Sequence, residues 1–139
     1  MRRLAILAAL AMTGCGSGSD DDGAGEERAI REWSRALNAE RYARAASFFA
    51  DGAIVEQGRE ILLEDRSDAI AFNRSLPCKA TVTDVDDEGD TLLAAFRLRG
   101  SPIGGCDGGT ARVRFRFRDG KFSEWRQLPE PEAPPGGTI

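Results

Sequence analysis

The first half of the chain has the spacing of apolar residues that is typical of amphipathic helices. Apolar side chains recur every three or four positions in residues 26–39 and again in residues 42–49, with a short break between them. An Asp-Gly pair at positions 51 and 52 stops the second stretch. Ser67 suits the N-cap of a third helix over residues 68–76, which Pro77 ends. The pattern therefore predicts three helices.

The rest of the chain alternates between apolar and polar positions, as strands do. Strands are expected at residues 53–57, 60–64, 81–86, 91–99, 111–118 and 121–128. Asp119 and Gly120 form a strong two-residue hairpin signal between the last two strands. Because the helices come first and a meander of antiparallel strands follows, the sequence predicts an α+β fold.

The last strand has two possible registers. Strict alternation turns Glu124 and Arg126 to the inner face, where unpaired charges are costly. A β-bulge after the hairpin turns Trp125 inward instead, and this or a solvated sheet edge is the interpretation that we favour. If the charges do point inward, Glu124 is the candidate pocket carboxylate of this half, and Glu56 is a weaker candidate.

The N-terminus resembles the signal peptide of a bacterial lipoprotein. Arg2 and Arg3 precede nine apolar residues, which are too few to span a bilayer. Residues 11–15 resemble a lipobox that ends at Cys15. The resemblance implies that residues 1–14 are removed and that Cys15 carries lipid, which anchors an extracytoplasmic protein to the cell membrane. An ordinary secretory signal and an uncleaved anchor are the alternatives.

The expected domain organisation follows from composition. The Gly/Ser/Asp-rich segment up to residue 25 is expected to be a flexible tether behind the lipidated cysteine. Residues 26–128 form one domain, and the Pro/Gly-rich residues 129–139 are expected to be a loose tail. The acidic run in the tether lacks the spacing of a calcium loop, so we expect no metal site and no cofactor.

Charge and residue types narrow the chemistry. The net charge is −4, and without Arg2 and Arg3 there remain 17 basic against 23 acidic residues, a net charge of −6. This balance disfavours binding to nucleic acid, which needs basic patches. The chain has no histidine, which excludes histidine general bases, Ser-His-Asp triads and histidine metal ligands.

The cysteine count fits the predicted anchor. If Cys15 carries lipid, Cys78 and Cys106 remain, and two thiols outside the cytoplasm are expected to pair. A reactive thiol is the alternative. A thiol becomes reactive when a basic neighbour lowers its pKa, but neither cysteine has a histidine beside it in the sequence, and only Cys78 has a lysine, Lys79. The bridge would tie the corner at Pro77 to a glycine-rich loop.

Arginines dominate one face of the predicted sheet. This arginine face comprises Arg97, Arg99, Arg112, Arg114, Arg116 and Arg118. It suits an anionic partner such as a phospholipid head group or an acidic glycan. A solvated outer face that blocks edge-to-edge pairing explains it equally simply, and we favour that interpretation.

Two segments resemble a known superfamily. Residues 36–56 and the hairpin at residues 116–122 are similar to the SnoaL-like, nuclear-transport-factor-2-like (NTF2-like) superfamily. The resemblance covers about residues 27–128 and implies a cone-shaped α+β barrel. In such a barrel three N-terminal helices pack on a curved antiparallel sheet around an apolar pocket. Separately from the resemblance, a homodimer through the sheet is a candidate assembly. The fold serves enzymes and binding modules alike, so it does not decide the function.

The resemblance argues against the known chemistries of this superfamily. On the ketosteroid isomerase pattern, Trp33 takes the place of the oxyanion-hole tyrosine, Gln57 that of the basic aspartate and Val113 that of the protonated acid. None of these side chains performs the corresponding role. The pocket candidates are Trp33, Leu37, Phe49, Val55, Gln57, Phe72, Val113 and Phe115. A filled core is the alternative for this set.

Three functions remain open. The leading hypothesis is a lipid-anchored binding or interaction domain without catalytic activity, with a small apolar ligand in the cone. The second is an isomerase- or lyase-like enzyme that uses Glu56 or Glu124. The third is an envelope accessory protein that docks an anionic partner on the arginine face.

Overall fold

The computed structural model of the protein describes residues 20–100 and 105–129, with only the backbone described for residues 20–22. The elements are α1 (Asp20–Asn38), α2 (Tyr42–Ala46), β1 (Phe49–Glu56), β2 (Glu60–Leu63), α3 (Arg66–Ser75), β3 (Lys79–Asp87), β4 (Leu92–Arg99), β5 (Thr110–Arg118) and β6 (Lys121–Gln127). The predicted signal peptide, Cys15, the start of the tether and residues 130–139 of the tail lie outside this part of the chain.

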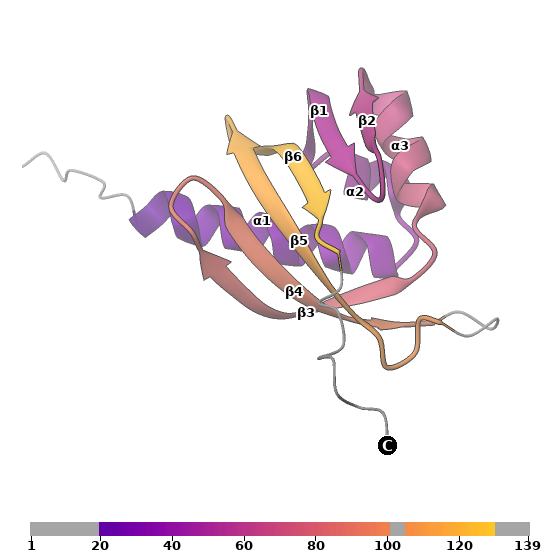
Figure 1. The fold of residues 1–139 in the computed structure, drawn as a ribbon. Helices are drawn as coiled ribbons and strands as arrows, with labels where there is room; N and C mark the ends of the chain where they lie inside the picture. The colour runs from indigo at the N-terminus through magenta and orange to yellow at the C-terminus, as the bar shows by residue number, and fades with distance from the viewer. Residues whose placement is uncertain (1–19, 101–104, 130–139) are drawn as a thin grey trace, which may run out of the picture.

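The strands form one curved, open sheet in the order β2-β1-β6-β5-β4-β3. Neighbouring strands are antiparallel except for β1 and β6, which are parallel. The sheet is therefore mixed and not, as expected, antiparallel throughout. The reason is that β6, the last strand of the meander, pairs with β1. Figure 1 shows α1 lying across one face of the sheet, with α2 and α3 gathered beside β1 and β2.

The first helix is longer than predicted. It begins at Asp20, so residues 20–25 are helical and the prediction of a random coil is wrong for them. Gly23 lies close enough to β3 that a Cβ atom would meet a carboxylate oxygen of Asp87 at 3.6 Å. Extending an existing helix costs less than starting one, and this explains how a glycine-containing segment joins it.

The second and third helices differ from the prediction at their ends. The second ends at Ala46, and Phe49 already belongs to β1, which was expected to start at residue 53. The backbone N–H of Phe122 donates to the carbonyl of Phe48, so pairing with β6 takes this segment out of the helix. In α3 the N-cap is Asp65, whose side chain accepts from the N–H of Asp68, and not Ser67.

A β-bulge sets the inner face of β6. Arg116 pairs with Glu124, but Phe117 pairs with Phe122, so β6 has one extra residue at Ser123. The bulge turns Trp125 inward, where it is 3% exposed. The bulged register is therefore confirmed, and the alternative that placed Glu124 and Arg126 inside is wrong.

An aromatic cluster fills the middle of the domain. The ring of Trp33 makes edge-to-face contacts at centroid distances of 5.9–6.3 Å with Phe49, Phe96, Phe115, Phe122 and Trp125. Such contacts add to the free energy gained by burying the rings. The core therefore occupies most of the space between α1 and the sheet.

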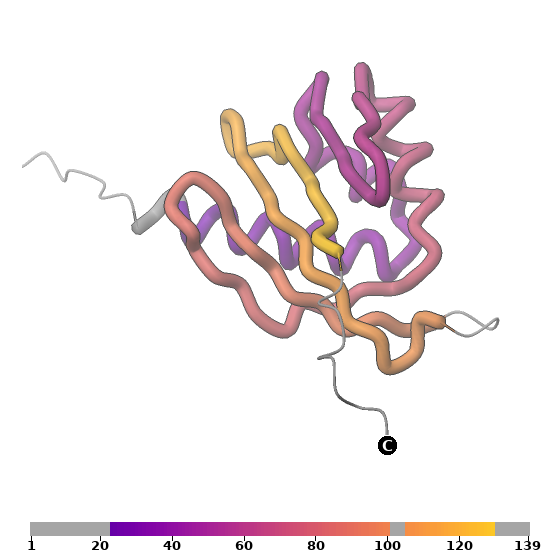
Figure 2. Tube along the Cα trace, viewed as in Figure 1, coloured from indigo at the N-terminus to yellow at the C-terminus, as the bar shows by residue number. Residues whose placement is uncertain are grey.

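A disulfide between Cys78 and Cys106 is present, as predicted, with 5.6 Å between the Cα atoms. It joins the connection from α3 to β3 with the loop that precedes β5, two segments that run side by side at one end of the sheet (Figure 2). Within the described part of the chain, no helix has both the length and the apolar character needed to cross a membrane.

Candidate functional site

An apolar pocket of about 100 Å³ lies at the end of the sheet near the disulfide. Its walls come from α1, from the residues that follow β1 and α3, and from β3 to β6. It is lined by Trp33, Leu37, Gln57, Leu76, Pro77, Cys78, Ala80, Phe96, Leu98, Ala111, Val113, Trp125 and Gln127. Gln57 and Pro77 are exposed, so the pocket opens to solvent beside them.

Half of the predicted pocket residues line this pocket. Four do so: Trp33, Leu37, Gln57 and Val113. The other four are buried core residues instead: Phe49, Val55, Phe72 and Phe115. The aromatic cluster around Phe122 fills their end of the domain. Both interpretations of the set are thus partly correct, since one end is filled and the other is open.

The sequence prediction missed several lining residues. Phe96 and Leu98 lie on the apolar face of a strand with regular alternation, so that signal was available. The burial of Trp125 depends on the bulge, which alternation alone does not reveal. Cys78 lines the pocket because the disulfide holds it there.

The N–H of Trp33 is used within the protein. Its Nε1 donates to Oδ1 of Asn73 at 2.8 Å, and Nδ2 of Asn73 donates to the carbonyl of Ala69 at 2.7 Å. Asn73 is fully buried in α3, so this pair links α1 to α3. The indole that takes the place of the oxyanion-hole tyrosine is therefore engaged with a partner from the chain.

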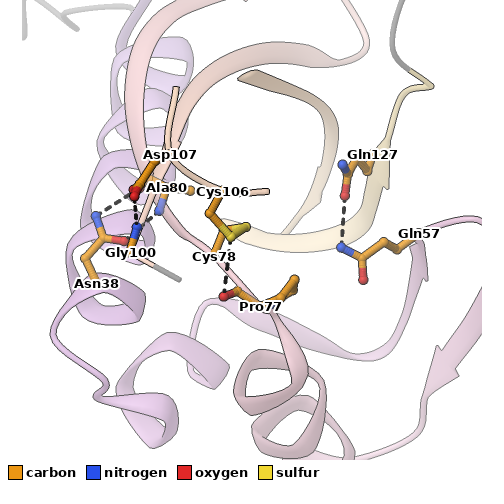
Figure 3. Close-up of a disulfide and its surroundings, with 9 residues drawn as sticks. All are labelled: Asn38, Gln57, Pro77, Cys78, Ala80, Gly100, Cys106, Asp107 and Gln127. Carbon is orange, nitrogen blue, oxygen red and sulfur yellow. Dashed lines mark hydrogen bonds between the residues drawn. A yellow bond between two sulfur atoms is a disulfide. The ribbon is translucent and has the colours of Figure 1, made fainter. Parts of the chain in front are cut away.

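The polar groups near the pocket mouth are neutral amides. Nε2 of Gln57 donates to Oε1 of Gln127 at 3.0 Å, and the two side chains face each other in Figure 3. An amide does not take up a proton near neutral pH, so this pair supplies no general base.

Trp125 differs from Trp33 in its hydrogen bonding. Its Nε1 is buried and has no hydrogen-bond partner among the described residues. The ring meets that of Phe72 edge to face, with 5.1 Å between the centroids. A buried donor without a partner is uncommon in folded proteins.

A bidentate amide fixes the pocket wall formed by β3. Nδ2 of Asn38 donates to the carbonyl of Ala80 at 2.9 Å, and the N–H of Ala80 donates to Oδ1 of Asn38 at 2.8 Å (Figure 3). The hydroxyl of Ser34 donates a second hydrogen bond to the same carbonyl. These bonds hold the C-terminal end of α1 against the strand whose Ala80 lines the pocket.

The two candidate carboxylates lie outside the pocket. Glu56 and Glu124 sit on the outer face of the sheet, where both bind Arg126, at 2.6 and 3.1 Å. Glu60 binds the same guanidinium at 2.9 Å. The bulge and the pairing of β1 with β6 bring these groups together, so the alternative that placed a carboxylate inside the pocket is wrong.

These contacts lower the pKa of Glu124. Partial burial of the carboxyl raises its pKa, but hydrogen bonds from Arg116 and Arg126 outweigh that effect. The pKa of Arg126 is raised by hydrogen bonds to Glu56, Glu60 and Glu124. A general acid near neutral pH needs a carboxyl with a raised pKa, and Glu124 is shifted in the opposite direction.

Half of the arginine face is already engaged within the protein. Arg114 binds Glu88 at 2.8 Å and Arg116 binds Glu124 at 2.9 Å. Arg118 donates to the carbonyl of Asp51 at 2.9 Å. The hydrogen bond from Arg114 lowers the pKa of Glu88. The others, Arg97, Arg99 and Arg112, are exposed and have no ion pair to another described residue.

The described residues contain no cluster of three or more histidine, cysteine, aspartate or glutamate side chains that would hold a metal ion. The pocket wall in this part of the chain also contains no acidic or basic side chain. Its chemistry is therefore that of apolar contact, aromatic faces and a few neutral hydrogen-bonding groups.

Solved structures with a similar fold come from several bacteria. A candidate ketosteroid isomerase from Kribbella flavida DSM 17836 has a TM-score of 0.64 and 22% identity, with 82% of this chain and 84% of that chain covered. An NTF2-like protein of unknown function from Burkholderia xenovorans LB400 has a TM-score of 0.62 and 21% identity, with 83% and 91% covered.

A third structure, of a candidate polyketide cyclase from Sinorhizobium meliloti, has a TM-score of 0.59 and 17% identity, with 73% of this chain and 94% of that chain covered. At these identities the likeness shows the fold alone. No curated protein matches the chain significantly in sequence.

A family model covers most of the domain. Residues 30–125 match the model described as a SnoaL-like domain, which is more than half of the chain. The predicted resemblance is thereby confirmed, with an open, mixed sheet in place of a closed antiparallel barrel. The chain belongs to the SnoaL-like domain family and has the NTF2-like fold.

Proposed function

We propose that the domain binds a small, largely apolar ligand in its pocket and does not catalyse a reaction there. The observation that carries the proposal is the chemistry of the pocket wall. Trp33, Phe96 and Trp125 supply aromatic surface, and the polar lining side chains of the described chain, those of Gln57 and Gln127 among them, are uncharged. A concave apolar surface with a few neutral polar groups is typical of small-molecule sites.

An enzymatic role has less support. Two of the similar structures are named for an isomerase and a cyclase. Proton transfer in such enzymes needs an acid or base within reach of the substrate. Here Glu56 and Glu124 are bound to Arg126 on the opposite side of the sheet. Docking of an anionic partner has less support too, because three of the six arginines of the arginine face bind groups within the domain.

We further propose that a lipid on Cys15 holds the domain at the outer side of the cell membrane. The support is the lipobox-like sequence and the cysteine count, since Cys78 and Cys106 pair with each other and Cys15 is left over. Disulfides form in oxidising compartments, which agrees with export. The pocket would then capture its ligand close to the membrane.

Tryptophan fluorescence tests the pocket directly, because the only two tryptophans of the chain both line it. We expect a saturable change in emission when the protein is titrated with small neutral ring compounds such as toluene, methylenecyclohexane and cyclohexanone. Ala111→Phe places a ring in the pocket and should abolish the change. Ala95→Phe is the matched control, because Ala95 lies on the neighbouring strand with its side chain outside the pocket lining.

The outcome that would overturn the proposal is an emission that responds to none of these compounds, or that responds equally in Ala111→Phe. Formation of a new product from a bound compound would favour the enzyme instead. For the anchor, intact mass of membrane-extracted protein should show a chain that starts at Cys15 and carries acyl groups. Cys15→Ser should lose both the acyl mass and the membrane association.

A further inference from the structure

A groove of about 290 Å³ lies on the surface between α1 and α2. Figure 1 shows α2 beside the C-terminal part of α1, where the two helices are in contact. This α1–α2 groove is lined by Glu32, Arg35, Ala36, Ala39, Arg41 and Arg44. It shares no lining residue with the apolar pocket, so it is a second candidate site with a different chemistry.

The spacing of residues on α1 explains why the surface is hollow here. Ala36 and Ala39 are three positions apart and therefore lie on the same side of the helix. Their short side chains leave space between the longer side chains that complete the lining. The backbone N–H of Arg41 donates to the carbonyl of Ala36 at 2.9 Å, which brings the chain back over the end of α1 toward α2.

The groove is basic, although the chain as a whole is acidic. Three arginines and one glutamate line it, a net charge of +2, whereas the chain has a net charge of −4. The carboxylate of Glu32 is 3.6 Å from Nη2 of Arg44, whose guanidinium also lies over the ring of Phe48. The exposed side chains of Arg35 and Arg41 have no ion pair with another described residue.

Helix electrostatics explains only part of this arrangement. Arg35 and Arg44 lie in the last turns of α1 and α2, where a positive charge stabilises a helix. Arg41 is the N-cap residue of α2, and its side chain makes no capping hydrogen bond. A positive charge is unfavourable at a helix N-terminus, so the position of Arg41 beside two other arginines needs another explanation.

The three guanidinium groups suit an anion with several oxygens. A guanidinium is a planar fork of N–H donors that binds phosphate oxygens in pairs. A phosphate monoester carries three terminal acceptor oxygens, so it can accept from more than one arginine at a time. The groove is larger than the roughly 150 Å³ cavity that holds benzene in another protein, so a phosphate with a small organic group fits its volume.

We propose that the α1–α2 groove binds a phosphate monoester, and that Arg35, Arg41 and Arg44 donate to its terminal oxygens. The proposal does not depend on the ligand of the apolar pocket, because the two sites have no lining residue in common. The monoester belongs to a soluble metabolite or to phosphatidic acid, a phospholipid whose head group is a phosphate monoester. The experiment separates these two sources.

The soluble arm uses glycerol 3-phosphate, with glycerol as the neutral control, and calorimetry as the readout. The protein is the full chain with Cys15→Ser, which removes the proposed lipid anchor. We expect glycerol 3-phosphate to bind and glycerol not to bind. Arg35→Gln and Arg41→Gln should each weaken the affinity about 3- to 10-fold, the loss expected for charge-assisted hydrogen bonds in an exposed site.

Arg66→Gln is the matched control for these variants. Arg66 is an exposed arginine on α3, it lies outside the groove lining, and it has no ion pair with another described residue. Its replacement removes the same charge and should leave the affinity unchanged. Arg35→Lys and Arg41→Lys keep the charge but lose the planar fork, so they should weaken binding less than glutamine does. They also serve if a glutamine variant does not fold.

The membrane arm uses sedimentation with vesicles of phosphatidylcholine and phosphatidic acid in equal parts, and with vesicles of phosphatidylcholine alone. Binding of glycerol 3-phosphate that the groove variants weaken supports the proposal with a soluble ester as the source. Binding to the phosphatidic acid vesicles alone, weakened by the same variants, supports it with the lipid as the source. The proposal is wrong if neither probe binds, or if Arg35→Gln and Arg41→Gln bind as well as Arg66→Gln.

Discussion

Asn38, the last residue of α1, joins a helix to a strand through a single side chain. Its amide both donates to and accepts from the backbone of Ala80, at 2.9 and 2.8 Å. We expect Asn38→Ala to lower the free energy of unfolding by about 1–3 kcal/mol, because the N–H of Ala80 loses its side-chain acceptor in a largely enclosed position. Urea denaturation measures the change.

Asn38→Asp is the matched control. It keeps an acceptor for the N–H of Ala80 but cannot donate to the carbonyl, so its stability should fall between those of the wild type and Asn38→Ala. An Asn38→Ala variant as stable as the wild type would show that the two bonds contribute nothing net. Periodicity did not reveal this role, because Asn38 is one of the polar residues of the predicted helix over residues 26–39 and its partner lies 42 residues away.

At the scale of elements, local pattern was most informative where neighbours in sequence are neighbours in space. The hairpin between β5 and β6 was predicted from Asp119 and Gly120, and both adopt positive φ, as a type I′ turn requires. The order of helices and strands was predicted for the same reason. The parallel pairing of β1 with β6 was not, because it joins segments about 70 residues apart, and no local signal encodes it.

The bulge at Ser123 is the element-scale feature on which the pocket depends most. Deleting Ser123 would remove the bulge. Phe122 and Trp125 would then be two positions apart, so strict alternation would keep both side chains inward and Glu124 outward. We expect this deletion to leave Trp125 buried and to lower the free energy of unfolding by only about 0.5–3 kcal/mol, the usual range for a single change. Urea denaturation followed by tryptophan emission measures both the stability and the exposure of Trp125.

Ser123→Ala is the control for this deletion, because it keeps the residue count. It should change the free energy of unfolding by no more than about 0.5 kcal/mol. A deletion variant in which Trp125 becomes exposed would contradict the expectation, and would mean that the bulge itself is needed to hold the ring inward. The sequence left both registers open, and the choice between them depends on the whole core, since the aromatic cluster has room for the ring of Trp125 beside that of Phe72.

At the scale of the whole molecule, the disulfide connects stability to the pocket. Cys78 lines the pocket and Cys106, which is 3% exposed, lies in the loop that precedes β5. The bridge closes a segment with a sequence separation of 28. By the chain-entropy estimate, replacing both cysteines with serine should lower the free energy of unfolding by roughly 3–4 kcal/mol. Cysteine pairing was predictable from the count, whereas its position in the pocket wall required the fold.

The same replacement should also weaken ligand binding. Without the bridge, Leu76 and Pro77 are held at the pocket by fewer constraints, so ordering them on binding costs more free energy. We expect the double variant to bind cyclohexanone more weakly than the wild type, and a reducing agent to produce the same two changes in the wild type but none in the variant. If stability falls while affinity is unchanged, the bridge supports the fold and the pocket wall is ordered without it, by contacts such as those of Asn38 with Ala80.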